Sequence, residues 1–207
     1  MAQIIACKSV NGIVLAGDSK SWAFQPDGKM QQLEVERLFQ LSQKAGILAS
    51  GTAEGINMCS ALKQFVQEEG LHNVDEIYNA ALPFLGSEYE KFMRKECEMP
   101  PLDPIHNIYF VLGGHTGKEI DPFRLYLIWT KKKLPQLDGD EITNAYTIPR
   151  RMGLEYKLNY LCREKTSVDA IADAIKEAME KLGVSQEEVG SPFVYASITK
   201  SGFQRIG

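Results

Sequence analysis

Residues 3–20 of this 207-residue chain read QIIACKSVNGIVLAGDSK. Apolar and β-branched runs flank the dipeptide Asn11-Gly12, and Asn-Gly favours the two positive φ angles of a type I′ turn. The pattern therefore predicts a β-hairpin that begins almost at the N-terminus. Because the two strands of a hairpin are antiparallel, Asp18 at the end of the second strand is expected close to Ala2 at the start of the first.

Composition and charge are those of an ordinary globular protein. Hydrophobic residues make up 44% of the chain and charged residues 24%, and a chain of this length can bury a sizeable core. We therefore expect a single domain over residues 1–207. The formal net charge of −4 argues against a surface for nucleic acid or for anionic membranes, so neither partner is expected.

The cysteines and histidines give no sign of a metal or redox centre. The four cysteines form no C-x-x-C pair and the three histidines have no metal-ligand spacing, so we expect reduced, mostly structural thiols, no metal and no cofactor. No charged segment leads into an apolar signal region, and no apolar run approaches the ~20 residues that span a bilayer. A cytoplasmic location is the prediction. The residues concerned are Cys7, Cys59, Cys97, Cys162, His72, His106 and His115.

Beyond the hairpin, strand pairs alternate with helix pairs. Short apolar runs bounded by turn residues predict three more strand pairs, 37–41 with 46–50, 108–112 with 123–129, and 193–198 with 203–206. Helical periodicity predicts four helices, from 53 to 70, from 73 through 92, around 153–161 and from 167 to 182. This order favours an α+β protein with antiparallel sheets covered by helices over a parallel, doubly wound fold.

Local signals predict how two of the helices begin and end. Asn73 with Glu76 three residues later has the spacing of a capping box. Ser167 is a candidate N-cap and Gly183 a candidate C-cap of the last helix. The stretch before Pro149, which contains Asp138-Gly139, looks less regular and predicts no strand.

Several segments, in this order, resemble the motifs of proteasome β-subunits and their bacterial relatives, members of the N-terminal-nucleophile hydrolase superfamily. The matching segments are Lys8, Gly12, Asp18-Ser19-Lys20, Arg37 with the strand 38–41, residues 48–55, residues 122–126 and residues 190–202. The resemblance covers nearly the whole chain. It implies a four-layer α-β-β-α sandwich with two antiparallel sheets.

The chemistry of that family depends on its first residue. A threonine freed at the chain start uses its hydroxyl as nucleophile and its own α-amino group as base, while a lysine tunes the pair and an aspartate holds the lysine. The resemblance assigns the nucleophile position to Ala2, the aspartate to Asp18 and the lysine position to Arg37. Alanine has no hydroxyl, so Ala2 is a vestigial nucleophile position.

The other departures agree with a silent site. Arginine keeps the positive charge of lysine but cannot be deprotonated and has a different shape, so Arg37 reads as vestigial, although it could pair with Asp18. The family's serine-containing loops should fall at Thr147–Pro149 and Ser185–Glu188, which do not keep its pattern. We expect a structural or regulatory protein in a ring-type assembly linked to proteolysis, built of copies of this chain or related subunits, with a possible ATPase partner.

Two alternatives remain open at this point. The chain could be an active threonine-peptidase-like or other N-terminal-nucleophile amide hydrolase whose nucleophile is elsewhere, and cleavage before Cys7 or Ser9 would expose a nucleophile type. It could also be a binding module that holds a small ligand in a cleft of the sandwich.

Overall fold

The computed structural model describes residues 2–24, 29–96, 107–131 and 136–207, so Cys97 and His106 lie outside the described part. The α+β class and the antiparallel sheets are confirmed. The helices are α1 (Glu54–Glu68), α2 (Val74–Glu96), α3 (Met152–Arg163) and α4 (Val168–Ser185). The strands are β1 (Ile4–Ser9), β2 (Gly12–Asp18), β3 (Lys20–Phe24), β4 (Met30–Glu34), β5 (Leu38–Ser42), β6 (Ala45–Gly51), β7 (Ile108–His115), β8 (Phe123–Thr130), β9 (Leu137–Ile142), β10 (Ala145–Ile148), β11 (Phe193–Thr199) and β12 (Gly202–Ile206).

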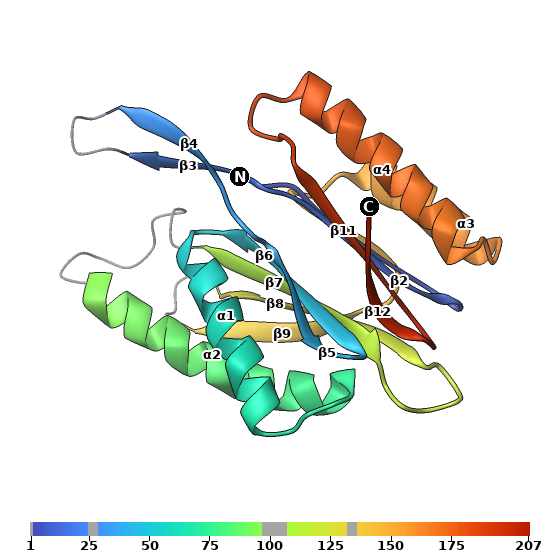
Figure 1. Ribbon diagram of the computed structural model, residues 1–207, viewed down its shortest axis with the longest axis horizontal. Helices are drawn as coiled ribbons and strands as arrows, with labels where there is room; N and C mark the ends of the chain where they lie inside the picture. The colour runs from blue at the N-terminus through green and yellow to red at the C-terminus, as the bar shows by residue number, and fades with distance from the viewer. Residues whose placement is uncertain (1, 25–28, 97–106, 132–135) are drawn as a thin grey trace.

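Two five-stranded sheets form the centre of the molecule (Figure 1). The first sheet has the order β10-β1-β2-β11-β12, and the second has the order β5-β6-β7-β8-β9. Every strand pairing in both sheets is antiparallel. The N-terminal hairpin therefore lies in the middle of the first sheet.

Apart from Lys8, Ser9 and Asp18, strands β1 and β2 have no polar side chains, because both faces of their sheet are covered. Successive side chains of a strand point to opposite faces. On β1, Ile5 packs in a cluster with Leu158 of α3 and with α4, whereas Ile4 packs against Val111 in a cluster shared with the second sheet. The apolar side chains of β1 therefore pack against two different layers.

Helices α1 and α2 cover the outer face of the second sheet. Their buried side chains, Met58 and Ile77 among them, share a cluster with Phe110 of β7. From one side to the other, the layers are α3 with α4, the first sheet, the second sheet, and α1 with α2 (Figure 1).

The structure has more sheets and more strands than the sequence predicted. Strands β3 and β4 form a third, two-stranded sheet, where two sheets were expected. This hairpin projects beyond the layers (Figure 1) and exposes Trp22 and Leu33. Strands β9 and β10 occupy the stretch expected to be irregular, and Asp138-Gly139 lies inside β9. These strands are short or polar edge strands, so their alternation is weak.

The turn of the opening hairpin differs from the prediction. Ser9 pairs with Gly12, so the turn residues are Val10 and Asn11, and Asn11 is not among the residues with positive φ. The type I′ turn at Asn11-Gly12 was therefore wrong. Glycine is required at position 12 for another reason, since a Cβ there would lie 2.5 Å from the carbonyl oxygen of Ile198 on β11.

The predicted helix starts are confirmed and one predicted end is wrong. The Glu76 N–H donates to Asn73 Oδ1 at 3.0 Å while the Asn73 N–H donates to Glu76 Oε2 at 3.4 Å, a reciprocal capping box. Ser167 Oγ accepts from the Ala170 N–H. Helix α4, however, continues through Gly183 to Ser185. A Cβ at Gly183 would lie 2.9 Å from the ring of Phe193, so this glycine makes room for close packing.

Candidate functional site

The start of β1 and the end of β2 bring Ala2, Gln3 and Asp18 together, as the hairpin predicted. The Asp18 N–H donates to the Gln3 carbonyl oxygen at 3.1 Å, and the Gln3 N–H donates to Asp18 Oδ1 at 3.2 Å. Ala2 is buried, and its carbonyl oxygen accepts a hydrogen bond from Ser50 Oγ of β6 at 3.1 Å. The Asp18 carboxylate is thus held at the chain segment that begins with Ala2.

Arg37 reaches this segment from the second sheet. It immediately precedes β5, and its carbonyl oxygen accepts from the Ala49 N–H. Its Nε lies 3.8 Å from Asp18 Oδ1, with the two side chains 4% and 0% exposed. Its Nη2 donates to the Lys20 carbonyl oxygen at 3.1 Å. The expected pairing of Asp18 with Arg37 is confirmed as a buried ion pair between the sheets.

Burial dominates the electrostatics of this pair. It raises the pKa of Asp18 to about 6, while the charge of Arg37 and the N–H of Gln3 act in the opposite direction. Burial likewise lowers the pKa of Arg37, and the Asp18 charge partly restores it. Arg37 Nε has no hydrogen-bond partner within the described residues, so its attraction to Asp18 is purely coulombic. Such a pair is costly to bury.

The arrangement supplies charge without a nucleophile. The side chain of Ala2 is a methyl group, which cannot attack a carbonyl carbon. The nearest hydroxyl in the hydrogen-bond network, that of Ser50, donates to the Ala2 carbonyl oxygen and is 1% exposed. A buried hydroxyl committed to a backbone acceptor is a structural group.

The two loop stretches assigned from the resemblance both lie beside this segment. Thr147 pairs with Ile5 across β10 and β1. On the other side, Lys20 Nζ donates to the Glu187 carbonyl oxygen, and the Ser19 N–H donates to the Pro192 carbonyl oxygen at 3.0 Å. Segments far apart in sequence therefore converge around Gln3 and Asp18.

A polar network that the sequence did not indicate links these stretches. Arg151 Nε donates to Gln3 Oε1 at 2.5 Å, and Arg151 Nη2 donates to Gln186 Oε1. The Gln3 amide in turn donates to the Ile148 carbonyl oxygen at 3.2 Å. Gln3 was the one residue whose sequence context could have indicated this network, because a glutamine in a run of buried residues needs hydrogen-bond partners. The partners themselves have no local signature.

Glu155 of α3 completes the network. Its Oε1 accepts from Thr147 Oγ1 at 2.7 Å and from Arg150 Nε at 2.8 Å, and its Oε2 accepts from Arg150 Nη2 at 2.6 Å. Burial raises the pKa of Glu155, but the bonds from Arg150 and Thr147 outweigh it, so the net pKa is lowered. An ionised Glu155 thus anchors α3 to β10.

The alternative nucleophiles Cys7 and Ser9 lie inside β1. Cys7 pairs with Val14 and Ala145 in the sheet, and Ser9 Oγ donates to the Gly12 carbonyl oxygen at 3.1 Å in the hairpin turn. Cleavage before Cys7 would remove half of the interior strand β1, and cleavage before Ser9 would remove all but its last residue. The geometry therefore favours structural roles for both in the intact fold.

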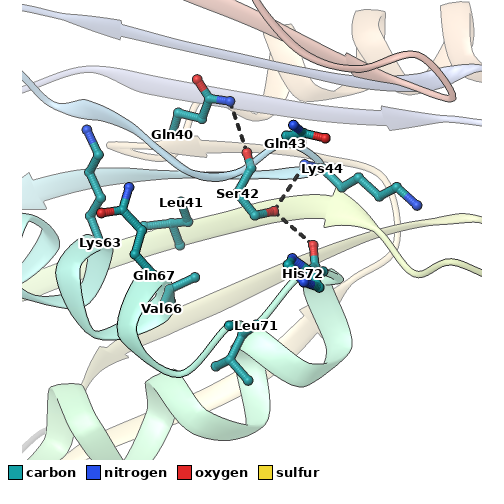
Figure 2. A pocket seen from close by; sticks show the side chains of 11 residues that line it. Gln40, Leu41, Ser42, Gln43, Lys44, Lys63, Val66, Gln67, Leu71 and His72 are labelled. Carbon is teal, nitrogen blue, oxygen red and sulfur yellow. Dashed lines mark hydrogen bonds between the residues drawn. The ribbon is translucent and has the colours of Figure 1, made fainter.

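A hollow of about 790 Å³ lies between the β5–β6 turn and the C-terminal end of α1, and Ala2, Asp18 and Arg37 do not line it (Figure 2). Ser42 and His72 do line it, and these are residue types of a nucleophile and a base. Ser42 Oγ, however, donates to the backbone carbonyl oxygen of His72 at 2.8 Å and accepts from the Lys44 N–H at 3.0 Å. The hydroxyl is not paired with the imidazole, so this is not a Ser–His catalytic arrangement.

Within the described ranges, no group of three His, Cys, Asp or Glu side chains could hold a metal ion. The helices of this part of the chain are also too short or too polar to cross a membrane. No protein-family model and no curated protein matches the chain significantly. The arrangement of Ala2, Asp18 and Arg37 is therefore the feature of the described residues that bears on function.

Proposed function

We propose that the chain is a proteasome β-subunit-like protein with the N-terminal-nucleophile hydrolase fold, a four-layer α-β-β-α sandwich over residues 1–207, whose site is catalytically silent. Its role is structural or regulatory, in a ring-type assembly linked to proteolysis. The observation that carries the proposal is the buried Asp18–Arg37 ion pair beside a residue, Ala2, that has no hydroxyl.

The convergence of distant segments supports the fold assignment. Asp18, Arg37 and the stretches at Thr147 and Glu187 come from four parts of the sequence and meet around the first strand. Asp18 and Arg37 lie in the motifs that resemble the family, whereas Thr147 and Glu187 lie in the two stretches where its serine-containing loops should fall. Burying an ion pair costs desolvation free energy. Descent from a charged catalytic site explains why this pair is present.

The residue types support a silent site. Catalysis at a chain-terminal residue needs a hydroxyl or thiol with a base beside it, and Ala2 has neither group. Arg37 stands where the family has a lysine, and its guanidinium donates to the Lys20 carbonyl oxygen. Because a guanidinium cannot be deprotonated, Arg37 provides fixed charge only.

An exposed strip of α3 supports the assembly. Met152, Tyr156 and Tyr160 are 78%, 77% and 57% exposed, and their spacing of four residues aligns them on one side of the helix. Tyrosine and methionine are enriched at protein–protein contacts. Further copies of this chain are the partner we propose for the strip, with related subunits and an ATPase as additional partners of the assembly.

An activity assay tests the silent site. The purified full-length chain is first checked by intact mass for its N-terminal residue, then incubated with fluorogenic peptides and with a covalent inhibitor directed at N-terminal threonines. We expect neither turnover nor an adduct. Turnover that the inhibitor blocks would overturn the proposal. Loss of such turnover in Cys7→Ala or Ser9→Ala would assign it to the displaced nucleophile.

Light scattering after size exclusion tests the assembly. We expect a mass that is a multiple of the single chain, and a smaller mass for Tyr156→Glu because a charge in an interface core is costly. Val184→Glu is the matched control, since Val184 is 92% exposed on α4, outside the strip. If the wild-type chain stays monomeric at every concentration, the proposed assembly is wrong. This outcome would not bear on the proposed lack of catalytic activity.

A further inference from the structure

Cys7 and Cys162 are 155 residues apart in sequence, and their sulfur atoms lie 3.2 Å apart. Cys7 is in β1 and Cys162 is in the last turn of α3. A disulfide bond is about 2.05 Å long, so the sulfurs need to approach by only roughly 1 Å to form one. Cys59, by contrast, is buried in the cluster beneath α1 and α2.

The two thiols differ in access. Cys7 is 1% exposed and Cys162 is 9% exposed. Cys162 also lines a hollow of about 420 Å³ together with Lys8 and Arg163. A small oxidant can therefore meet Cys162 first, while Cys7 lies behind it in the sheet. Lys8 is already paired with Asp121 at 3.0 Å in this hollow, so the access of Cys162 rests on its exposure rather than on a cationic surrounding.

The two thiols also differ in acidity. The hydrogen bond with Cys7 lowers the pKa of Cys162, although burial acts against this. The same hydrogen bond, together with burial, raises the pKa of Cys7. The proton is thus best held by Cys7, and Cys162 has the greater thiolate character. The thiolate is the reactive form of cysteine.

We propose that Cys7 and Cys162 form a reversible disulfide when the protein meets a hydroperoxide, with Cys162 as the attacking and Cys7 as the resolving cysteine. The Cys162 thiolate attacks a peroxide oxygen, the O–O bond breaks, and the leaving alkoxide or hydroxide takes up a proton. Cys7 sulfur then attacks the Cys162 sulfenic acid and expels hydroxide, which takes the Cys7 proton to form water. Two thiols are oxidised and one peroxide is reduced.

The bond would link β1, an interior strand of the first sheet, to α3, which covers that sheet. β1 pairs with both β2 and β10, and α3 carries the exposed strip of Met152, Tyr156 and Tyr160. A cross-link over so long a loop restricts the unfolded chain strongly. We expect the melting temperature of the oxidised protein to rise by roughly 5 to 15 °C, and the rise to vanish with a dithiol reductant.

Peptide mapping tests the proposal. The full-length chain is treated with a small excess of hydrogen peroxide, its remaining thiols are alkylated under denaturing conditions, and the digest is read by mass spectrometry. We expect a cross-linked peptide that contains Cys7 and Cys162, lighter by two hydrogen atoms, which dithiothreitol separates. Cys59→Ala should form it equally well.

Variants of the pair make the result decisive. In Cys7→Ala and in Cys7→Ser, Cys162 should accumulate as a sulfenic acid that dimedone traps, because the resolving thiol is gone. The peptide mapping of the wild-type chain remains a valid test even if these variants fold poorly. A wild-type pair that stays reduced while Cys59 or a methionine is oxidised would overturn the proposal, as would a cross-link through Cys97.

Discussion

The two ends of β1 hold buried reactive side chains of different kinds. At the Gln3 end, Asp18 and Arg37 supply charge, but the adjoining residue Ala2 has no nucleophilic atom. At the other end, Cys7 and Cys162 supply two sulfur nucleophiles in contact, but their cationic neighbours only line the outer hollow. An N-terminal nucleophile needs charge and nucleophile at the same end, and this strand separates them.

The difference has an energetic consequence. A thiol behaves as a small apolar group and is inexpensive to bury, whereas an ionised carboxylate loses its hydration and depends on its partner. Changes at the Gln3 end should therefore affect stability far more than changes at the Cys7 end. Four substitutions, in decreasing order of expected effect, test this ranking.

Replacing Arg37 by methionine should have the largest effect. Arg37→Met leaves the Asp18 carboxylate buried without its partner, and the free energy of unfolding at pH 7.5 should fall by about 3–5 kcal/mol. Urea denaturation measures this change. Arg94→Met is the control, because Arg94 is 78% exposed in its pair with Glu90 on α2. This substitution should lower the free energy of unfolding by under about 1 kcal/mol. Equal losses for the two variants would contradict the buried-charge argument.

The pH dependence of Asp18 should be next in size. The folded pKa of about 6 lies above the unfolded value of about 3.9, so the folded state binds the proton more tightly. Stability contributed by Asp18 is therefore complete below about pH 4 and falls as pH rises towards 6. The difference in free energy of unfolding between the wild type and Asp18→Asn should drop by about 2–3 kcal/mol over this range. A difference that grows with pH would refute the raised pKa.

Replacing Gln3 by leucine should have an intermediate effect. Gln3→Leu removes the acceptor of Arg151 Nε and the donor to the Ile148 carbonyl oxygen, and unsatisfied buried groups should lower stability by about 1–3 kcal/mol. Thermal or urea unfolding checks the loss. Gln64→Leu on α1 is the matched control, since Gln64 is exposed and its side chain donates to Glu68 Oε1 of the same helix. A neutral Gln3→Leu would mean that the network is satisfied by water.

Removing one thiol should have the smallest effect. Cys162→Ala, kept with a reductant, loses a small apolar contact and a weak S–H hydrogen bond, so we expect a loss of about 1 kcal/mol. Urea unfolding of the reduced proteins measures it. A loss as large as that of Arg37→Met would show that the two ends of β1 do not differ as proposed.

Much of the fold could be predicted from local pattern. Both faces of β1 and β2 are buried, so most of their residues are apolar. The Asn73–Glu76 capping box and the Ser167 N-cap act within a few residues. Strand β9 was missed because its polar side chains conceal the alternation, and β10 was missed because it is only four residues long. The turn was misplaced because the position of Gly12 depends on its close approach to Ile198, which is distant in sequence.

The candidate site was predictable in part. Ala2 and Asp18 could be brought together from the hairpin, and Arg37 from the resemblance. Gln3, Arg151 and Glu155 were missed as a network, since their partners are separated by up to 148 residues. A single sequence carries no local trace of such a pairing.

The amino-acid sequence by itself determined the alternation of the main strand pairs with helix pairs and the absence of a hydroxyl at Ala2, because periodicity and residue type are local properties. Only the tertiary structure decided that Arg37 neutralises Asp18, that Arg151 holds Gln3 and that Cys7 touches Cys162. These contacts join different sheets and layers. Their energies depend on burial, and burial exists only once the layers have packed together.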